Sequence, residues 1–151
     1  MITTKLVKKL RDKTGISVMQ CKKALEETDG DMEKAIVLLS QKSADVASKK
    51  GDRTLGAGIV SSYIHATGTV GTMVELLCET DFVAQNEEFK SLARDISMQV
   101  SAMNPESTEA LLEQTFIKNP EMTITNLIQS ATQKFGEKIE ISRFVRYSIS
   151  Q

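Results

Sequence analysis

Residues 70–89 read VGTMVELLCETDFVAQNEEF, and the period of the hydrophobic residues changes within them. In the first part, alternate residues share one face, as in a strand with one buried side: Val70, Thr72, Val74, Leu76 and Cys78. After Asn86, which can cap a helix, the apolar residues follow the helical period as far as Met103. The stretch therefore predicts a strand, a short joint and a long helix.

The joint, ETDFVAQN at residues 79–86, holds a phenylalanine beside an aspartate. In one interpretation Phe82 is a core ring that seals the edge of the sheet, and Asp81 caps the following turn. In the other interpretation, the scaffold holds the ring outward for a pocket on another protein. Judged on these residues alone, the buried ring is favoured.

The residues around this stretch predict a small antiparallel sheet of about three strands, covered by helices. Runs 56–65 and 70–79 are rich in strand-forming residues and flank the turn sequence ATGT, which indicates a hairpin. Further along, we expect an extended or irregular segment at 111–117, a helix at 123–136 and a third strand at 137–149. The order β-β-α-α-β is typical of an α+β domain.

The first 40 residues predict three short amphipathic helices instead. Their apolar stripes are Leu6, Val7 and Leu10, then Val18, Cys21, Ala24 and Leu25, then Met32, Ala35, Ile36 and Leu39. Helices this short are stable only when they bury their stripes against one another, as in a ubiquitin-associated-like bundle. We therefore expect a helical bundle at 1–40, a polar basic linker at 41–55 and an α+β core at 56–151.

The composition gives little electrostatic attraction toward nucleic acid or an anionic membrane, because 19 basic and 20 acidic residues leave a net charge of -1. The start, MITTKLVKKL, has no apolar segment of signal-peptide length, and no later run is long enough to span a bilayer. We expect a cytoplasmic protein that binds neither membrane nor nucleic acid directly. Cys21 and Cys78 are then expected to be buried thiols in a reducing compartment.

No catalytic machinery is apparent in the sequence. His65, the only histidine, is expected before a turn, where a surface histidine is commoner than a catalytic base. Without a P-loop or a Cys-x-x-Cys motif, we expect no cofactor, no metal and no covalent chemistry. The basic residues between Lys42 and Arg53 can contact phosphate or form a solvated linker, and the neighbouring Asp45 and Asp52 favour the linker.

Several stretches, in order along nearly the whole chain, resemble the elongation factor Ts family. They are LVKKLRDKTGISVMQCKKALEETDGDMEKAIVLL at 6–39, TDFV at 80–83, NEEFKSLARDISMQVSAMNP at 86–105, LLEQTFIKNP at 111–120 and KFGEKIEISRFVRY at 134–147. The resemblance implies a guanine-nucleotide exchange factor. Its partner would be the translational GTPase elongation factor Tu, in the GDP-bound and nucleotide-free states, in the bacterial cytoplasm.

The resemblance also implies which residues contact the GTPase. Thr80, Asp81, Phe82 and Val83 match the motif that disturbs the Mg²⁺ and phosphate side of the nucleotide pocket, with Phe82 as the inserted wedge. GDP would then leave, and GTP would dissociate the nucleotide-free complex. Further matches to contact positions of the family are Lys22 in the bundle and His65, Phe135 and Gly136 in the core.

The chain departs from the family pattern in two ways. Members of ordinary size carry an added helical segment where this chain has only ESTEA at 106–110, and larger members have two core subdomains in tandem with a coiled-coil insert. A single three-stranded sheet leaves edges that need cover. A homodimer is therefore a further hypothesis, with the edge near EISRFVRYSI at 140–149 as the one that pairs.

Two other classes of function stay open on the sequence. The chain could be a general interaction module, in which the bundle recognises ubiquitin-like or other helical partners and the core is only a scaffold. It could also be a phosphate-handling enzyme of an unrecognised type. Phe82 separates the exchange factor from the interaction module, because its ring is exposed in the first and buried in the second.

Overall fold

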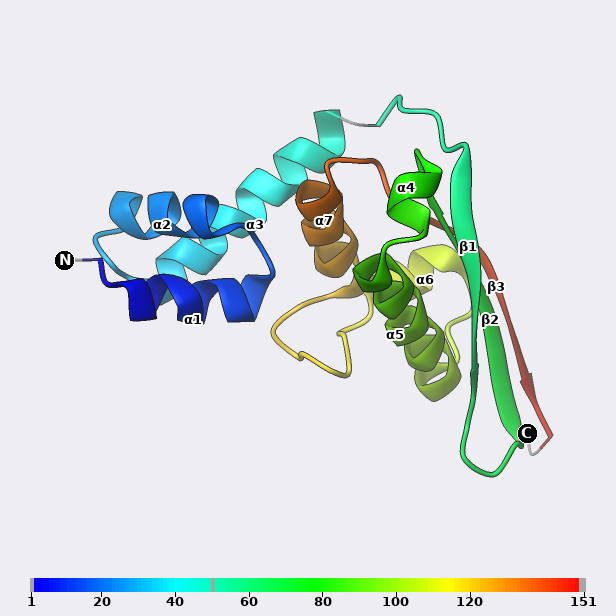
Figure 1. The fold of residues 1–151 in the computed structure, drawn as a ribbon. Coiled ribbons are helices and arrows are strands. Elements are labelled where there is room, and N and C mark those ends of the chain that lie inside the picture. Colours follow the sequence, from blue (N-terminus) through cyan, green and yellow to red (C-terminus); the bar gives the residue numbers. More distant parts are fainter. Residues whose placement is uncertain (1, 50, 150–151) are drawn as a thin grey trace. The chain divides into compact units, whose positions relative to one another are not determined.

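The computed structural model describes residues 2–49 and 51–149 (Figure 1). Contacts divide the chain into two compact units. The first comprises the residues up to Asp52 together with Gln129–Gly136, and the second comprises Arg53–Ile128 together with the chain from Glu137 onward. Helices combined with an antiparallel sheet confirm the predicted α+β class. The domain boundaries at residues 40 and 55 stay a prediction.

Three N-terminal helices form the frame of the first unit: α1 (Thr4–Thr14), α2 (Val18–Glu27) and α3 (Met32–Lys49). The hydroxyls of Thr3 and Ser17 accept backbone N–H groups at the starts of α1 and α2, and Gly15 ends α1 with a φ of 71°. The helices bury one another through Val7, Leu10, Ile16, Cys21, Ala24, Leu25, Ala35 and Leu39. Val18 is 50% exposed, which corrects its place in the predicted stripe.

Helix α3 continues to Lys49, through much of the stretch that the sequence suggested as a linker. Ser43 explains why apolar periodicity did not reveal this extension. Its side chain is buried and its hydroxyl donates to the Gln133 side chain, which belongs to the same unit. Gln133 in turn donates to the Gln20 side-chain oxygen at 3.1 Å. Polar contacts at Ser43 therefore help to hold this part of α3.

The second unit is built on a three-stranded antiparallel sheet in the order β1-β2-β3. Its strands are β1 (Ala57–Ile64), β2 (Val70–Cys78) and β3 (Glu140–Ser148). In the central strand, Val74 pairs with Ser61 on one side and with Phe144 on the other. The pairing of β2 with β3 has one irregularity, between Glu75 and Leu76.

One face of this sheet is covered and the other is open. Helix α5 (Glu87–Met103) packs on β1 and β2, and Figure 1 shows the helices of the unit on one side of the sheet. The alternating residues of β2 face this helix, as the period of two predicted. The core of the unit includes Val74, Leu76, Cys78, Phe89, Ala93, Ile96, Val100, Leu111 and Ile141.

The remaining helices are α4 (Asp81–Ala84), α6 (Thr108–Glu113) and α7 (Ile124–Phe135). Helix α6 corrects part of the expectation for residues 111–117, because their first residues are helical. The rest of that segment is irregular, as predicted. It is held by the buried Gln99, whose side chain donates to the Thr115 carbonyl at 3.0 Å and accepts the Ile117 N–H at 3.0 Å.

Candidate functional site

Phe82 lies in the one-turn helix α4, which joins β2 to α5. Thr80 caps this helix, because its hydroxyl accepts the Val83 N–H at 3.4 Å and its carbonyl accepts the Ala84 N–H at 3.1 Å. Val83 and Ala84 are buried, whereas the Phe82 side chain is 86% exposed. The turn is therefore anchored on one side and presents the phenylalanine ring to solvent on the other.

This exposure excludes the interpretation of Phe82 as a core ring. A ring that plugs a core loses nearly all its accessible surface, as Phe89 does in α5 with an exposure of 0%. Leaving a phenylalanine side chain in water forgoes about 1.5–3 kcal/mol of hydrophobic stabilisation. The buried ring that the general interaction module required is not found. Phe82 is instead available to a pocket on another molecule.

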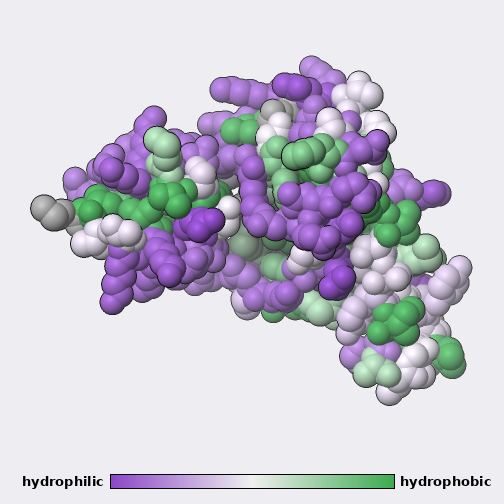
Figure 2. Space-filling view, viewed as in Figure 1, coloured by the Kyte–Doolittle hydropathy of each residue, from purple (hydrophilic) through white to green (hydrophobic). Residues whose placement is uncertain are grey.

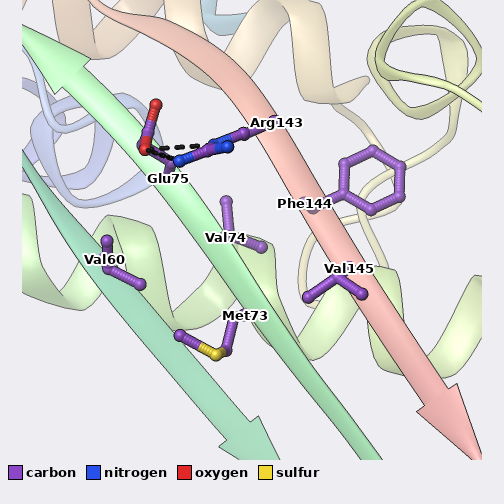
Figure 3. A pocket seen from close by; sticks show the side chains of 7 residues that line it. All are labelled: Val60, Met73, Val74, Glu75, Arg143, Phe144 and Val145. Atoms are coloured by element: carbon purple, nitrogen blue, oxygen red, sulfur yellow. Dashed lines mark hydrogen bonds and ion pairs between the residues drawn. The ribbon is translucent and has the colours of Figure 1, made fainter.

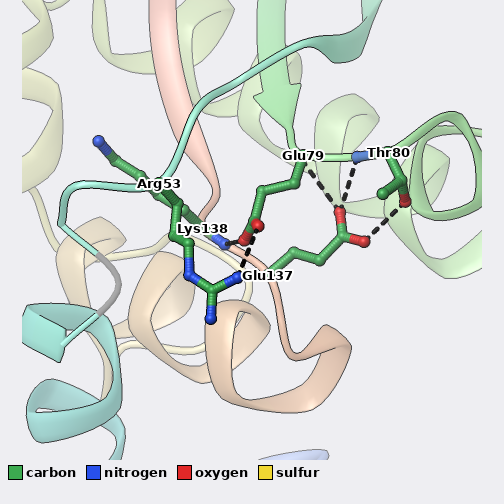
Figure 4. A network of polar contacts seen from close by, with 5 residues as sticks. All are labelled: Arg53, Glu79, Thr80, Glu137 and Lys138. Carbon is green, nitrogen blue, oxygen red and sulfur yellow. Dashed lines mark hydrogen bonds and ion pairs between the residues drawn. The ribbon is translucent and has the colours of Figure 1, made fainter.

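A carboxylate from a distant part of the chain holds the start of α4 (Figure 4). Glu137 Oε1 accepts the backbone N–H groups of Glu79 and Thr80, both at 3.0 Å, and Oε2 accepts the Thr80 hydroxyl at 2.6 Å. The Glu79 carboxylate accepts the Lys138 N–H at 2.6 Å and pairs with the Arg53 guanidinium at 3.4 Å. Residues 79–80 and residues 137–138 thus each provide backbone N–H donors and a carboxylate acceptor to the other pair.

Cys78, the last residue of β2, contacts the same turn from the buried side. Its thiol donates to the Thr80 carbonyl oxygen at 3.3 Å. Burial raises the pKa of the Cys78 thiol, and the nearby Glu137 carboxylate raises it further. The thiol therefore stays protonated at neutral pH and keeps donating to the turn.

We expect the protein to lose stability as the pH rises above the ordinary thiol pKa of about 8.5. The pKa of Cys78 is higher in the folded than in the unfolded chain, so the unfolded state binds fewer protons and the free energy of unfolding falls with pH. Denaturant unfolding between about pH 7 and pH 10 measures this slope. The slope should be shallower in Cys78→Ala, and an equal slope in both proteins would assign it to other groups.

Two of the other predicted contact residues, Lys22 and His65, are exposed and belong to other elements than α4. Lys22 is exposed on α2, in the first unit, and pairs with Glu26 at 4.0 Å. His65 is exposed in the turn between β1 and β2, with its Nδ1 atom 3.3 Å from the Tyr63 hydroxyl. Because Thr80 follows the other end of β2, the length of that strand separates it from His65.

Phe135 and Gly136 close helix α7. Phe135 is half-buried, and the Lys134 ammonium lies 5.9 Å from the centre of its ring. Gly136 has a φ of 71° and donates its N–H to the Thr132 carbonyl at 3.0 Å. A left-handed glycine is the usual end of a helix, so Gly136 has a conformational role of its own. It turns the chain directly into Glu137, the residue that binds Thr80.

The sheet face that α5 leaves open carries exposed apolar side chains. Met73 in the central strand pairs with Ser62 and Val145 in its two neighbours. Figure 3 shows Val60, Met73 and Val145 together, with the Glu75–Arg143 ion pair close by. The exposed large side chains of this face are Val60, Ile64, Met73, Val145 and Tyr147. Figure 2 shows hydrophobic surface toward the hairpin end of the sheet.

Within residues 2–49 and 51–149, no group of three or more histidine, cysteine, aspartate or glutamate side chains could hold a metal ion. Among the helices of these residues, none is both long and apolar enough to cross a membrane. Cys21 and Cys78 are free and buried, as the sequence predicted.

Sequence reasoning missed the residues that support the turn, namely Glu137, Glu79 and Arg53. Glu137 lies 57 residues beyond Thr80, and nothing in the local pattern of either segment indicates the contact. One signal was available. Gly136 predicted the end of a helix, so a reversal of the chain just before Glu137 could have been foreseen, although not its partner.

Known proteins resemble this chain over its whole length. The family model described as elongation factor TS matches residues 79–151. Elongation factor Ts of Carboxydothermus hydrogenoformans is 40% identical over 196 aligned positions, which cover 100% of this chain and 90% of the relative. Elongation factor Ts of Thermodesulfovibrio yellowstonii is 41% identical, with 99% and 97% covered.

The alignment with the first relative is longer than this chain, which has 151 residues, so that relative carries residues without a counterpart here. Elongation factor Ts of Heliobacterium modesticaldum gives the same result, with 37% identity over 196 positions that cover 100% of this chain and 91% of the relative. Identity at this level over nearly the full length of both proteins shows common ancestry. The chain belongs to the elongation factor Ts family.

Proposed function

We propose that this translation elongation factor binds elongation factor Tu in its GDP-bound state and accelerates the release of GDP. The observation that carries the proposal is the 86% exposure of Phe82 on an anchored turn, in a chain of this family. The partner follows from the family. It would act in the bacterial cytoplasm, without covalent chemistry and without a cofactor of its own.

The exchange reaction is a competition between two ligands of the GTPase. A GTPase holds its nucleotide through backbone amides around the phosphates and through Mg²⁺. At nanomolar affinity, about -12 kcal/mol, dissociation is slow. Insertion of Phe82 next to the Mg²⁺ and phosphate side of the pocket would favour a state that holds both poorly. By linkage the nucleotide and the factor weaken each other equally, so that fresh GTP expels the factor.

Insertion of one ring does not account for the whole loss of nucleotide affinity that exchange requires. Burial of one phenylalanine is worth about 1.5–3 kcal/mol, or roughly ten- to a hundred-fold in an equilibrium. Other contacts must add binding free energy. Lys22 is accessible for this on α2 and His65 in the hairpin turn. Phe135, which is half-buried, and the exposed Gly136 are further candidates, although Gly136 also ends α7.

Size-exclusion chromatography of this chain with elongation factor Tu tests the proposed linkage. We expect the two proteins to elute together when the GTPase is free of nucleotide, and to separate when GDP or GTP is present in excess. Elution together that does not respond to nucleotide would indicate a binding protein that is no exchange factor. Separate elution under both conditions would show that elongation factor Tu is not the partner.

We also propose that two copies of the chain pair through the open face of the sheet. The support is the set of exposed apolar side chains around Met73. The charges within this face, Glu75 and Arg143, neutralise each other in the same chain, so they do not oppose a symmetric approach of an identical face. This face replaces the β3 edge as the proposed contact, because face-to-face packing of two sheets buries side chains as well as backbone.

Sedimentation at tens of micromolar is expected to give twice the monomer mass of 16.7 kDa. Met73→Lys places a charge in the centre of the face and is expected to shift the protein to monomer. Val37→Lys, an equally exposed position on α3, is the matched control and should leave the mass unchanged. A monomer in the parent protein, or no difference between the two variants, would contradict the proposed dimer.

A further inference from the structure

We infer that Glu137 is a positioning residue for exchange, which holds Phe82 in place through Thr80; this inference rests on the proposed function. The Glu137 carboxylate accepts three hydrogen bonds from the start of α4, at 3.0, 3.0 and 2.6 Å. They come from two backbone N–H groups and one hydroxyl. A carboxylate with this set of donors fixes both the backbone and the side chain of Thr80.

A continuous path of hydrogen bonds links Glu137 to the turn that carries Phe82. The Thr80 hydroxyl donates to Glu137 and accepts the Val83 N–H at 3.4 Å. With its proton committed to Glu137, the hydroxyl directs a lone pair toward Val83, so the cap of α4 depends on the carboxylate. Asp81 and Phe82 lie between the two ends of this path, in the turn that it closes.

The path matters because the Phe82 ring has little support of its own, being 86% exposed. An unanchored turn would have to be ordered when the ring enters the pocket, at the cost of the conformational entropy of each side chain that is immobilised. Glu137 removes part of that cost by ordering the turn in advance. The reciprocal bond from the Lys138 N–H to the Glu79 carboxylate, at 2.6 Å, keeps the two segments together.

Glu137 acts through Thr80 and not through its charge. Its three donors are neutral groups, and a glutamine in its place keeps an oxygen for the two backbone N–H groups. The glutamine amide can also donate to the Thr80 hydroxyl, which still accepts from Val83. Glu137→Gln should therefore retain most of the activity, whereas Glu137→Ala removes every one of these bonds. A residue that contacted Mg²⁺ or phosphate groups by charge would respond equally to both changes.

The test measures GDP release from elongation factor Tu as a function of the concentration of this protein. We expect Glu137→Ala to lower the maximal release rate about 10-fold, with less than a ~2-fold change in the half-saturating concentration, and Glu137→Gln to stay within ~3-fold of the parent. Glu140→Ala, the same loss of charge at an exposed position three residues away, is the matched control and should match the parent. An unchanged rate in Glu137→Ala, or equal losses in the alanine and glutamine variants, would overturn the inference.

The double variant Phe82→Ala, Glu137→Ala tests whether one residue acts through the other. In the absence of the ring, loss of Glu137 is expected to cause no further decrease in the release rate, because the two residues form one unit. Equal decreases from Glu137→Ala with and without Phe82 would show an independent role for Glu137 and overturn the inference.

Hydrogen exchange in the free protein separates this inference from the proposed function. We expect the backbone amides of residues 79–84 to exchange about 10-fold faster in Glu137→Ala, whatever the partner is. Unchanged exchange in this segment would overturn the positioning role even if the protein proves to be an exchange factor. Faster exchange, combined with no effect of Phe82→Ala on GDP release, would instead refute the proposed function and leave the local role of Glu137 intact.

Discussion

Replacement of Phe82 by alanine is expected to leave the fold intact and to slow GDP release from elongation factor Tu at least ~10-fold, which corresponds to ~1.4 kcal/mol in the barrier. The side chain is 86% exposed, so the folded protein loses little buried surface when the ring is removed. Exposed substitutions of this kind change the free energy of unfolding by about 0.5 kcal/mol or less. Thermal melting and stopped-flow release of a fluorescent GDP analogue measure the two effects.

The same variant is expected to keep much of its affinity for nucleotide-free elongation factor Tu, because the bundle and the rest of the core are unchanged. Asp81→Ala should have a weaker effect in the same direction. Ile117→Ala removes an exposed apolar side chain outside both α4 and the sheet, with 40% exposure, and serves as a control for the loss of an exposed apolar side chain. A large fall in melting temperature for Phe82→Ala, with an unchanged rate of GDP release per folded molecule, would show that Phe82 stabilises the core and has no role in exchange.

Replacement of Phe89 by alanine is expected to have the opposite pair of effects, namely a large loss of stability and little change in GDP release. Phe89 is fully buried in α5, seven residues after Phe82, and its removal leaves a cavity. A Phe→Ala change in a core costs about 3–5 kcal/mol, which lowers the melting temperature of a domain of this size by roughly 6–20 °C. Below the melting temperature of the variant, its folded fraction should accelerate the release of GDP from elongation factor Tu nearly as much as the parent protein does.

Comparison of the two phenylalanine variants by the same assays distinguishes stability from function. If Phe89→Ala melted like the parent, the assignment of α5 as the core helix of the second unit would be contradicted. If Phe89→Ala slowed release per folded molecule as much as Phe82→Ala, the two rings would not have separate roles. Far-UV circular dichroism gives the folded fraction for both variants.

The hydrophobic period predicted the elements that bury apolar side chains. The alternation from Val70 to Cys78 and the helical stripe after Asn86 appear as β2 and α5, and the first two apolar stripes of the N-terminal region appear as α1 and α2. Elements held by polar contacts were missed for a physical reason. The extension of α3 is stabilised at Ser43 by a hydroxyl–amide hydrogen bond, and a buried serine gives no hydrophobic signal.

The candidate site was only partly predictable. The residues of the turn itself could be proposed because they are contiguous in the sequence and resemble a family motif. Their support could not, because Glu137 and Thr80 meet only when β3 pairs with β2 and closes the end of the sheet. Judged on the residues of the turn alone, burial of Phe82 was favoured, whereas the family resemblance implied an exposed ring. The structure exposes the ring, because Val83 and Ala84 take the buried positions of the turn.

The release of a fluorescent GDP analogue from elongation factor Tu, with and without this protein, tests the central claim most directly. The GTPase is loaded with the analogue, mixed with excess unlabelled GDP, and followed by fluorescence as the concentration of this protein is raised. We predict that the release rate rises with that concentration and saturates, and that Phe82→Ala lowers the plateau. A release rate that stays at its spontaneous value at micromolar concentrations of the folded protein would contradict the proposed function.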